Sequence, residues 1–197
     1  SVLADIHLEG KAIPVAGGAV NQTYRIEEQT KSYFLKIHPN IGKSFFEAEV
    51  DGLKELAPYV RVPDTYMLGE LQGGAYLLME WIEPGKGDFK DLASSLAKLH
   101  HVTAPQFGYR KDNYLGVLPQ QNQYEEDWWL FFFKNRLESQ IQLAEKNNRW
   151  NQIRQEKFID FKQYVLDNFE NKKVVPSLLH GDLWSGNVFF DQQGKPV

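Results

Sequence analysis

The order of the predicted elements indicates an α+β fold, with strands in the first part of the chain and helices after them. Three observations support this class. Two β-prone runs lie close together at 22–27 and 32–37, a continuous apolar run of strand length covers 75–82, and beyond residue 87 the apolar residues recur at helical spacing. The hydrophobic content of 42% over 197 residues is sufficient for a core.

The predicted sheet begins with a hairpin, because the polar stretch 28–31 separates the strands Gln22 to Glu27 and Ser32 to Ile37. The pair Gly17-Gly18 precedes it as a flexible corner. A helix is expected over 43–57, where apolar residues share one stripe and a proline follows: Phe46, Leu53, Leu56 and Pro58. The run AYLLMEWI at 75–82 indicates a buried central strand.

A break at Pro84-Gly85-Lys86-Gly87 predicts a boundary between two lobes, residues 1–83 and 84–197. Three helices are expected beyond it, with a Gly-, Pro- and Asn-rich loop at 107–124 between the first two. Their apolar spacings are 92/96/99, 129/133/137/141/144 and 158/161/165/169. The chain then closes with the apolar stretch 174–179, an eight-residue polar segment and the start of a hairpin.

Composition excludes several classes of function. The net charge is −4 with both signs interspersed, so no basic face for nucleic acid is expected. The absence of cysteine excludes disulfides, thiolate metal sites and cysteine nucleophiles. No apolar run approaches the ~20 residues of a membrane span, and the first five residues do not resemble a signal peptide. We therefore expect a cytoplasmic protein that binds neither nucleic acid nor membrane.

The strongest chemical signal is the segment HGDLWSGN, from His180 to Asn187. Phosphoryl transfer needs a carboxylate to orient or deprotonate the accepting hydroxyl and an oxygen ligand for Mg²⁺ nearby. Asp182 and Asn187, five positions apart, supply both groups from one loop. The alternative is a turn that uses Gly, Asp and Asn for backbone reasons only.

Lys36, within the apolar strand 33–37, is a candidate for binding ATP phosphates, although a lysine on an exposed strand face is common. Glu49 follows Phe46 by three positions and precedes Leu53 by four, so it shares the inward stripe of its helix and is the expected partner of Lys36. Glu47 is rotated away from that stripe. The alternative for Glu49 is a surface salt bridge.

Two weaker signals concern the nucleotide. Gly17 and Gly18 precede a strand, where backbone amides could cover phosphates, but they do not match G-x-G-x-x-G and equally suit a plain turn. Met79, Glu80 and Trp81 lie where a backbone segment could contact adenine, and a buried strand end explains them equally well. No H-E-x-x-H metal motif and no G-x-S-x-G nucleophile elbow is present.

These residues together resemble the fructosamine kinase (ketosamine kinase) family, whose loop also reads HGDLWSGN, within the kinase-like fold of aminoglycoside phosphotransferases and choline kinases. Further matching segments span nearly the whole chain: 17–18, 34–36, 76–80, 96–100, 107–108, 112–114, 119–120, 122, 127–128, 132–133, 136–137 and 140. The resemblance implies a bilobal fold, with an antiparallel N-lobe sheet carrying one helix and a mainly helical C-lobe that is truncated here.

The resemblance also implies function: ATP- and Mg²⁺-dependent phosphorylation of the sugar of a ketoamine, free or on a protein lysine, in deglycation repair. By position, the resemblance implies that Asp182 is the base and Asn187 a metal ligand, while Lys36 holds the ATP phosphates and Glu49 holds Lys36. Trp184 could stack on the sugar or pack under the loop. Asp112 and Asn113 belong to a family insertion that could shape the acceptor pocket.

One departure is that the family's second acidic metal ligand, expected shortly after the turn 191–194, is lacking before Val197. We therefore expect the chain to be a fragment that binds Mg-ATP poorly and turns over little. Two alternatives stay open. One is a kinase for another hydroxyl compound, such as an aminoglycoside or choline, and the other is a catalytically silent binding protein. The particular ketoamine, the sugar hydroxyl and the oligomeric state are left open by the sequence.

Overall fold

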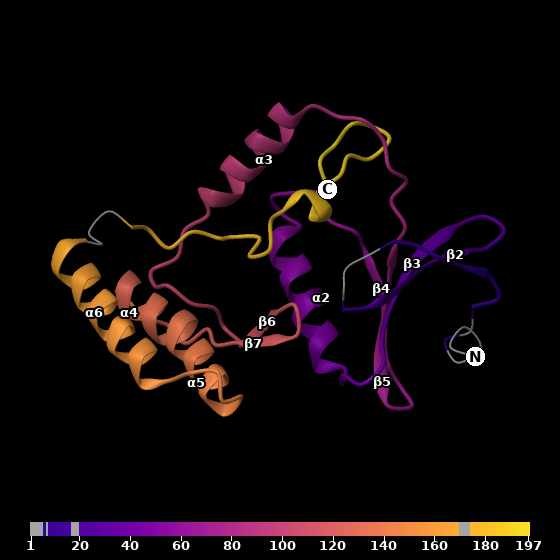
Figure 1. Ribbon diagram of the computed structural model, residues 1–197. Coiled ribbons are helices and arrows are strands. Elements are labelled where there is room, and N and C mark those ends of the chain that lie inside the picture. The colour runs from indigo at the N-terminus through magenta and orange to yellow at the C-terminus, as the bar shows by residue number, and fades with distance from the viewer. Residues whose placement is uncertain (1–5, 7, 17–19, 170–173) are drawn as a thin grey trace. The chain divides into compact units, whose positions relative to one another are not determined.

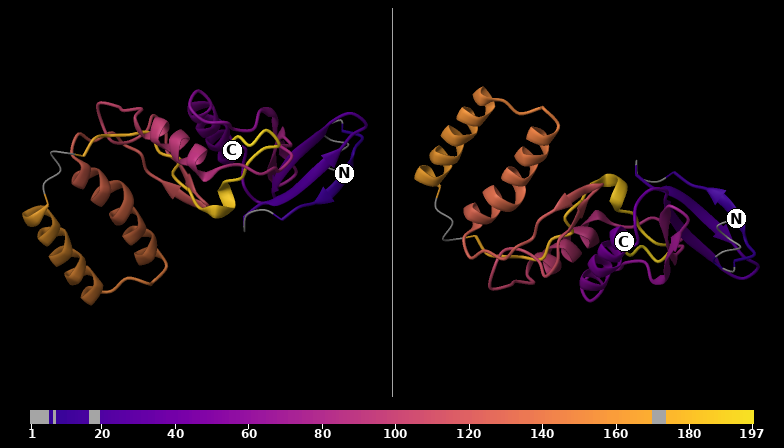
Figure 2. Two further views of the ribbon diagram at one scale, coloured as in Figure 1. Left: turned by 90° about the horizontal axis from the view of Figure 1, so that it is seen from above. Right: turned by 90° about the horizontal axis from the view of Figure 1, so that it is seen from below.

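The computed structural model describes residues 6, 8–16, 20–169 and 174–197. They form two compact units, and Figures 1 and 2 show the elements of each. The first unit consists of the residues up to Leu99 together with His180–Val197, and the second consists of His100–Leu179. The predicted division into lobes at residue 84 stays a prediction.

A five-stranded antiparallel sheet forms the centre of the first unit, in the order β1-β2-β3-β5-β4. The predicted hairpin is confirmed, and the Glu28 N–H closes its turn by donating to the Lys31 carbonyl at 2.9 Å. β1 and β4, which the sequence did not predict, lie at the two edges. The strands are β1 (Lys11–Pro14), β2 (Gln22–Glu27), β3 (Ser32–His38), β4 (Thr65–Leu71) and β5 (Gly74–Glu80).

Burial on both faces of the sheet explains the continuous apolar run in β5. Leu78 and Tyr76 pack on one face with Ile26 and Leu35. Leu77 and its neighbours pack on the other face against α2 (Ser44–Leu56), including the fully buried Phe46. A strand covered on both faces needs apolar residues at successive positions. The prediction of a buried interior strand is therefore confirmed.

After β5 the chain continues within the first unit to a helix. Residues 81–88 lead into α3 (Phe89–His100), which confirms the helix predicted from apolar spacing. The final hairpin turns at 191–194, where the Gly194 N–H donates to the Asp191 carbonyl at 3.0 Å. Its first arm pairs with the segment after β5, because Pro84 and Asp191 form an antiparallel bridge. Residues 180–187 precede this hairpin in the sequence, at the point where the chain re-enters the first unit. They contain the short 3₁₀ turn η2 (Ser185–Asn187).

The second unit is mainly helical. The long helix predicted around 129–144 is continuous, but its middle is a π-helical segment, as its three parts show: α4 (Trp128–Phe132), η1 (Phe133–Glu138) and α5 (Ser139–Lys146). Figures 1 and 2 show α6 (Gln152–Asn168) alongside it, and Phe133 contacts Phe158 and Phe161 across the pair.

The predicted loop at 107–124 contains a short hairpin, β6 (Asn113–Leu115) with β7 (Leu118–Gln120). The sequence did not indicate it because strands of three residues are too short for an alternating pattern. Within the described part of the chain, no helix combines the length and apolar character needed to cross a membrane.

Candidate active site

The first polar pair of the site joins the sheet to α2. Lys36 Nζ lies 2.5 Å from Glu49 Oε1, and about a quarter of each side chain is exposed. Lys36 is in register with Leu77 of the interior strand β5, so its stem crosses apolar surroundings. Glu49 reaches it because Phe46 anchors the same helix face against the sheet. The structure therefore contains the contact that the helix stripe predicted.

The second polar pair lies within the loop 180–187. The Asn187 amide nitrogen donates to the Asp182 carbonyl at 2.8 Å and to Asp182 Oδ2 at 3.1 Å. The Asp182 N–H donates to Nδ1 of His180 at 3.2 Å. Gly181 occupies the left-handed region with φ of 88°, which favours glycine at the bend. The loop thus holds its carboxylate and its amide in direct contact.

All residues of this loop are exposed. Among the described residues, the contacts of this loop use the amide nitrogen of Asn187 and leave its oxygen, and Oδ1 of Asp182, without a partner. The amide oxygen fits a Mg²⁺ ion, which binds few protein groups and completes its shell with phosphates and water. Among the described residues, no group of three or more His, Cys, Asp or Glu side chains is placed to hold a metal.

Trp184 lies on the surface of the loop, and 58% of its side chain is exposed. Its ring crosses the backbone at Gly186 so closely that a Cβ atom there would clash with the indole. The Asn187 N–H also donates to the Trp184 carbonyl at 2.9 Å. One part of the indole therefore packs on its own loop, and the remainder is open to a ligand.

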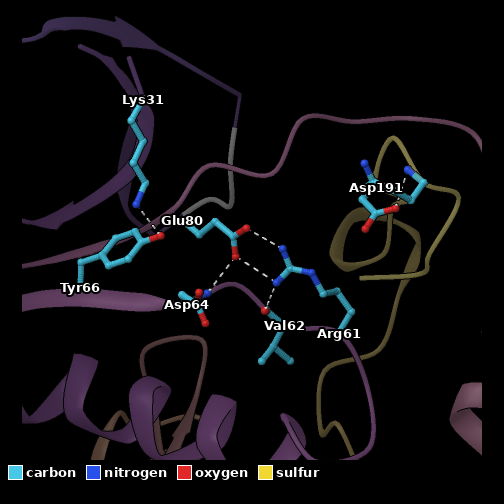
Figure 3. Close-up of polar contacts among 8 residues, drawn as sticks. Lys31, Arg61, Val62, Asp64, Tyr66, Glu80 and Asp191 are labelled. Carbon is cyan, nitrogen blue, oxygen red and sulfur yellow. Dashed lines mark hydrogen bonds and ion pairs between the residues drawn. The ribbon is translucent and has the colours of Figure 1, made fainter. Parts of the chain in front are cut away.

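The segment Met79-Glu80-Trp81 has its side chains committed to neighbours in the first unit. Met79 is buried. The Glu80 carboxylate accepts two hydrogen bonds from Arg61, at 2.9 and 2.5 Å, and one from the Asp64 N–H at 3.1 Å (Figure 3). Trp81 Nε1 donates to Glu83 at 2.7 Å. Any contribution of this segment to nucleotide binding therefore falls to its backbone.

Arg61 is a residue that sequence reasoning missed. Its hydrogen bonds to Glu80 lower the pKa of that carboxyl and raise the pKa of the guanidinium, because each charge stabilises the other. The available signal was an acid at the end of an apolar strand, which needs a cation. The sequence alone did not identify that cation, since 19 positions separate the two residues.

Asp112 and Asn113 lie in the second unit, where they hold the β6–β7 hairpin. Oδ1 of Asp112 accepts from the Asn122 N–H at 2.9 Å, and Oδ1 of Asn113 accepts from the Asn122 side chain at 2.8 Å. Asn122 is buried and also accepts from Arg136 at 2.8 Å. Desolvation lowers the pKa of Arg136, and the charge of Asp112 opposes that effect. Gly17 and Gly18 lie outside the described residues.

Comparisons with known proteins identify relatives over almost the whole chain. The model of the fructosamine kinase family matches residues 4–197. A protein of Enterococcus faecium named probable ketoamine kinase is 72% identical over 100% of this chain and 71% of its own length. A chloroplastic protein-ribulosamine 3-kinase of Arabidopsis thaliana is 37% identical over 96% of this chain and 62% of its own length.

Solved structures agree with this placement. A protein of Haemophilus somnus assigned to the fructosamine-3-kinases superposes with a TM-score of 0.80 at 25% identity, covering 99% of this chain and 68% of that one. An aminoglycoside phosphotransferase superposes with a TM-score of 0.64 at 13% identity, covering 100% and 67%. The latter likeness concerns the fold alone, and it confirms the α+β, protein-kinase-like architecture expected from the sequence.

Proposed function

Since the chain belongs to the fructosamine kinase family, a family of phosphotransferases, we propose that the whole protein transfers the γ-phosphoryl group of ATP to a sugar hydroxyl of a ketoamine. The observation that carries this proposal is the placement of two polar pairs, Lys36 with Glu49 and Asp182 with Asn187, in one compact unit. Together they supply a held cation for phosphates and an exposed carboxylate beside an amide oxygen.

The first pair serves the nucleotide. A lysine cation neutralises phosphate oxygens, but a free lysine side chain samples many rotamers. The 2.5 Å contact with Glu49 restricts Lys36 and keeps its ammonium at one place above the sheet. Because β3 and α2 both pack in the core, the position of the cation is set by rigid elements rather than by a loop.

The second pair serves the acceptor. Asp182 accepts the proton of the attacking hydroxyl, or orients that hydroxyl, and such a group typically contributes ~10²–10⁴ in rate. The Asn187 amide holds Asp182 Oδ2 and leaves Oδ1 available to the hydroxyl. Mg²⁺, when bound with ATP, supplies positive charge against the phosphate oxygens. Asn187 is the described residue that would hold it, through its amide oxygen.

The acceptor class follows from relatives and from one exposed ring. The similar Arabidopsis protein is named protein-ribulosamine 3-kinase, which supports a ketoamine on a protein amine as acceptor and a role in deglycation. The exposed part of the Trp184 indole suits the apolar face of a sugar ring. Asp112 and Asn113 are proposed to shape the acceptor pocket through the hairpin that they hold. A cytoplasmic location stays a prediction.

The test is ADP release by the full-length gene product with Mg-ATP and a model fructosamine or ribulosamine. We expect turnover that requires the ketoamine and falls by at least about a hundredfold in Asp182→Asn. Asp160→Asn, an equivalent change on the exposed surface of α6, should retain wild-type turnover. Release of ADP that is indifferent to the ketoamine, or that survives in Asp182→Asn, would contradict the proposal.

A further inference from the structure

The end of strand β5 is tied to the segment that joins α2 to β4. The Arg61 guanidinium faces Glu80 as a fork, with Nη1 donating to Oε2 at 2.9 Å and Nη2 to Oε1 at 2.5 Å. The Asp64 N–H donates to the same carboxylate at 3.1 Å, and the Glu80 N–H donates to the Asp64 carbonyl at 2.8 Å. Figure 3 shows how these contacts converge on Glu80. Glu80 is thus held both by its side chain and by its backbone.

The Arg61 guanidinium is also held by a second contact, to its own backbone. Arg61 Nη1 also donates to the Val62 carbonyl at 2.5 Å, so the guanidinium is oriented by its own backbone. Its side chain is 31% exposed and that of Glu80 is 23% exposed, which reduces screening by solvent relative to a surface pair. A bidentate arginine–carboxylate contact restricts geometry in a way that a lysine point charge does not.

The chain immediately after Glu80 is held again a few residues later. The Gly85 N–H donates to the Phe190 carbonyl at 2.7 Å, and Pro84 bridges Asp191. A Cβ atom on Gly85 would clash with the Asp191 carbonyl, so the two backbones approach as closely as glycine allows. The segment 81–83 therefore lies between two backbone attachment points, one at Glu80 and one at the hairpin that follows the loop 180–187. Its side chains also contact Arg25 and Phe34 of the sheet.

Asp191 belongs to the second attachment point. Its side chain is 5% exposed, and its Oδ1 accepts from the N–H groups of Gln193 and Lys195 at 2.9 and 2.8 Å. Its negative charge acts favourably on Arg61, and Figure 3 draws it on the side of Arg61 turned away from Glu80. Arg61 thus lies among three parts of the first unit: the α2–β4 connection, the end of β5 and the final hairpin.

We infer that Arg61 is a positioning residue for ATP, which acts through Glu80 to fix the backbone at 81–83 relative to the loop carrying Asp182. The inference rests on the proposed function, because it assigns that backbone to the adenine side of the nucleotide. It differs from a stabilising role alone, since a stabilising residue would affect all ligands and all steps alike. A positioning role predicts a selective loss of nucleotide affinity.

The experiment uses the full-length gene product with three variants: Arg61→Lys, which keeps the charge but loses the fork, Arg61→Met and Glu80→Gln. Lys162→Met is the matched control, because Lys162 also donates to a carboxylate, that of Glu138, at 2.6 Å, but belongs to the second unit. For each protein, KM for ATP, KM for the ketoamine, kcat, the affinity for AMP-PNP by calorimetry and the unfolding midpoint are measured.

We expect KM for ATP and the dissociation constant of AMP-PNP to rise about tenfold in Arg61→Met, less in Arg61→Lys and not in Lys162→Met, because small displacements of a binding element weaken only the contacts it makes. Hydrogen exchange should accelerate at the amides of Glu80 and Gly85. KM for the ketoamine should stay near the wild-type value in all variants.

Two results would overturn the inference. One is an unchanged affinity for AMP-PNP in both Arg61→Lys and Glu80→Gln, and the other is an equal weakening of ATP and ketoamine binding. If wild-type protein turns over no ketoamine, the proposed function fails, while the AMP-PNP affinities still decide the role of Arg61. A wild-type protein that binds no nucleotide would contradict both.

Discussion

Two polar clusters in this chain have similar residues and opposite environments. Asp182 and Asn187 in the first unit contact each other in an exposed loop and keep oxygen atoms free of partners among the described residues. Asp112, Asn113 and the buried Asn122 in the second unit direct their side chains at one another and at the backbone of a hairpin. The exposed loop thus keeps oxygen atoms that can bind a substrate or a metal, which suits chemistry. The side chains of the second cluster use their hydrogen bonds to hold the hairpin.

The largest effect that the comparison predicts is on activity. Asn187→Ala removes the amide that holds Asp182 and the oxygen proposed for Mg²⁺, so we expect turnover to fall about a hundredfold. Because the loop is exposed, the free energy of unfolding should change by less than about 0.5 kcal/mol. Steady-state ADP release and urea unfolding of the full-length protein measure both. A variant that loses stability in proportion to activity would erase the distinction between the clusters.

The opposite pattern is expected at Asn122. Its truncation to alanine leaves the Asn113 and Arg136 side chains without their buried partner, which should lower the free energy of unfolding by about 2 kcal/mol. Urea unfolding of Asn122→Ala measures this loss. Asn168→Ala, at the exposed end of α6, is the control and should cost about 0.5 kcal/mol or less. A stable Asn122→Ala protein would show that the hairpin cluster is not structural.

A smaller effect is expected at Gly186, where space rather than charge matters. Gly186→Ala places a methyl group against the Trp184 ring, so the indole must move away from its loop. We expect KM for the ketoamine to rise a few-fold while KM for ATP is unchanged, because the ring is proposed to contact only the sugar. Initial-rate kinetics with each substrate varied in turn distinguishes these constants. An equal rise in KM for ATP and KM for the ketoamine would contradict a contact of the ring with the sugar alone.

The smallest effect concerns the intermediate case, the partly buried pair of Arg61 and Glu80. The folded-state pKa of Glu80 lies below its ordinary value, so its contribution to stability is present above the unfolded pKa of about 4.5 and is lost as pH falls through the lower folded value. Solvent screening limits this contribution to less than about 1 kcal/mol. Unfolding of wild type and Glu80→Gln at pH 7 and pH 3 measures it, and the two proteins should converge at the lower pH.

Local patterns predicted the elements whose signal lies within a few residues. The hairpin β2–β3, the helix α2 and the interior strand β5 were all indicated by alternation, helical spacing or a continuous apolar run. The edge strand β4 was missed because its burial does not alternate cleanly between buried and exposed positions. The π-helical segment η1 was missed because its apolar spacing is close to that of an ordinary helix.

The same division holds for the site. The sequence by itself determined the loop motif and the pairing of Lys36 with Glu49, since a five-residue spacing and one helix stripe place those groups through local geometry. Only the tertiary structure determined that Glu80 contacts Arg61 and that Asn113 contacts Asn122. Those contacts depend on how strands, connections and hairpins pack together. Packing between segments distant in sequence sets them, and no local sequence pattern records it.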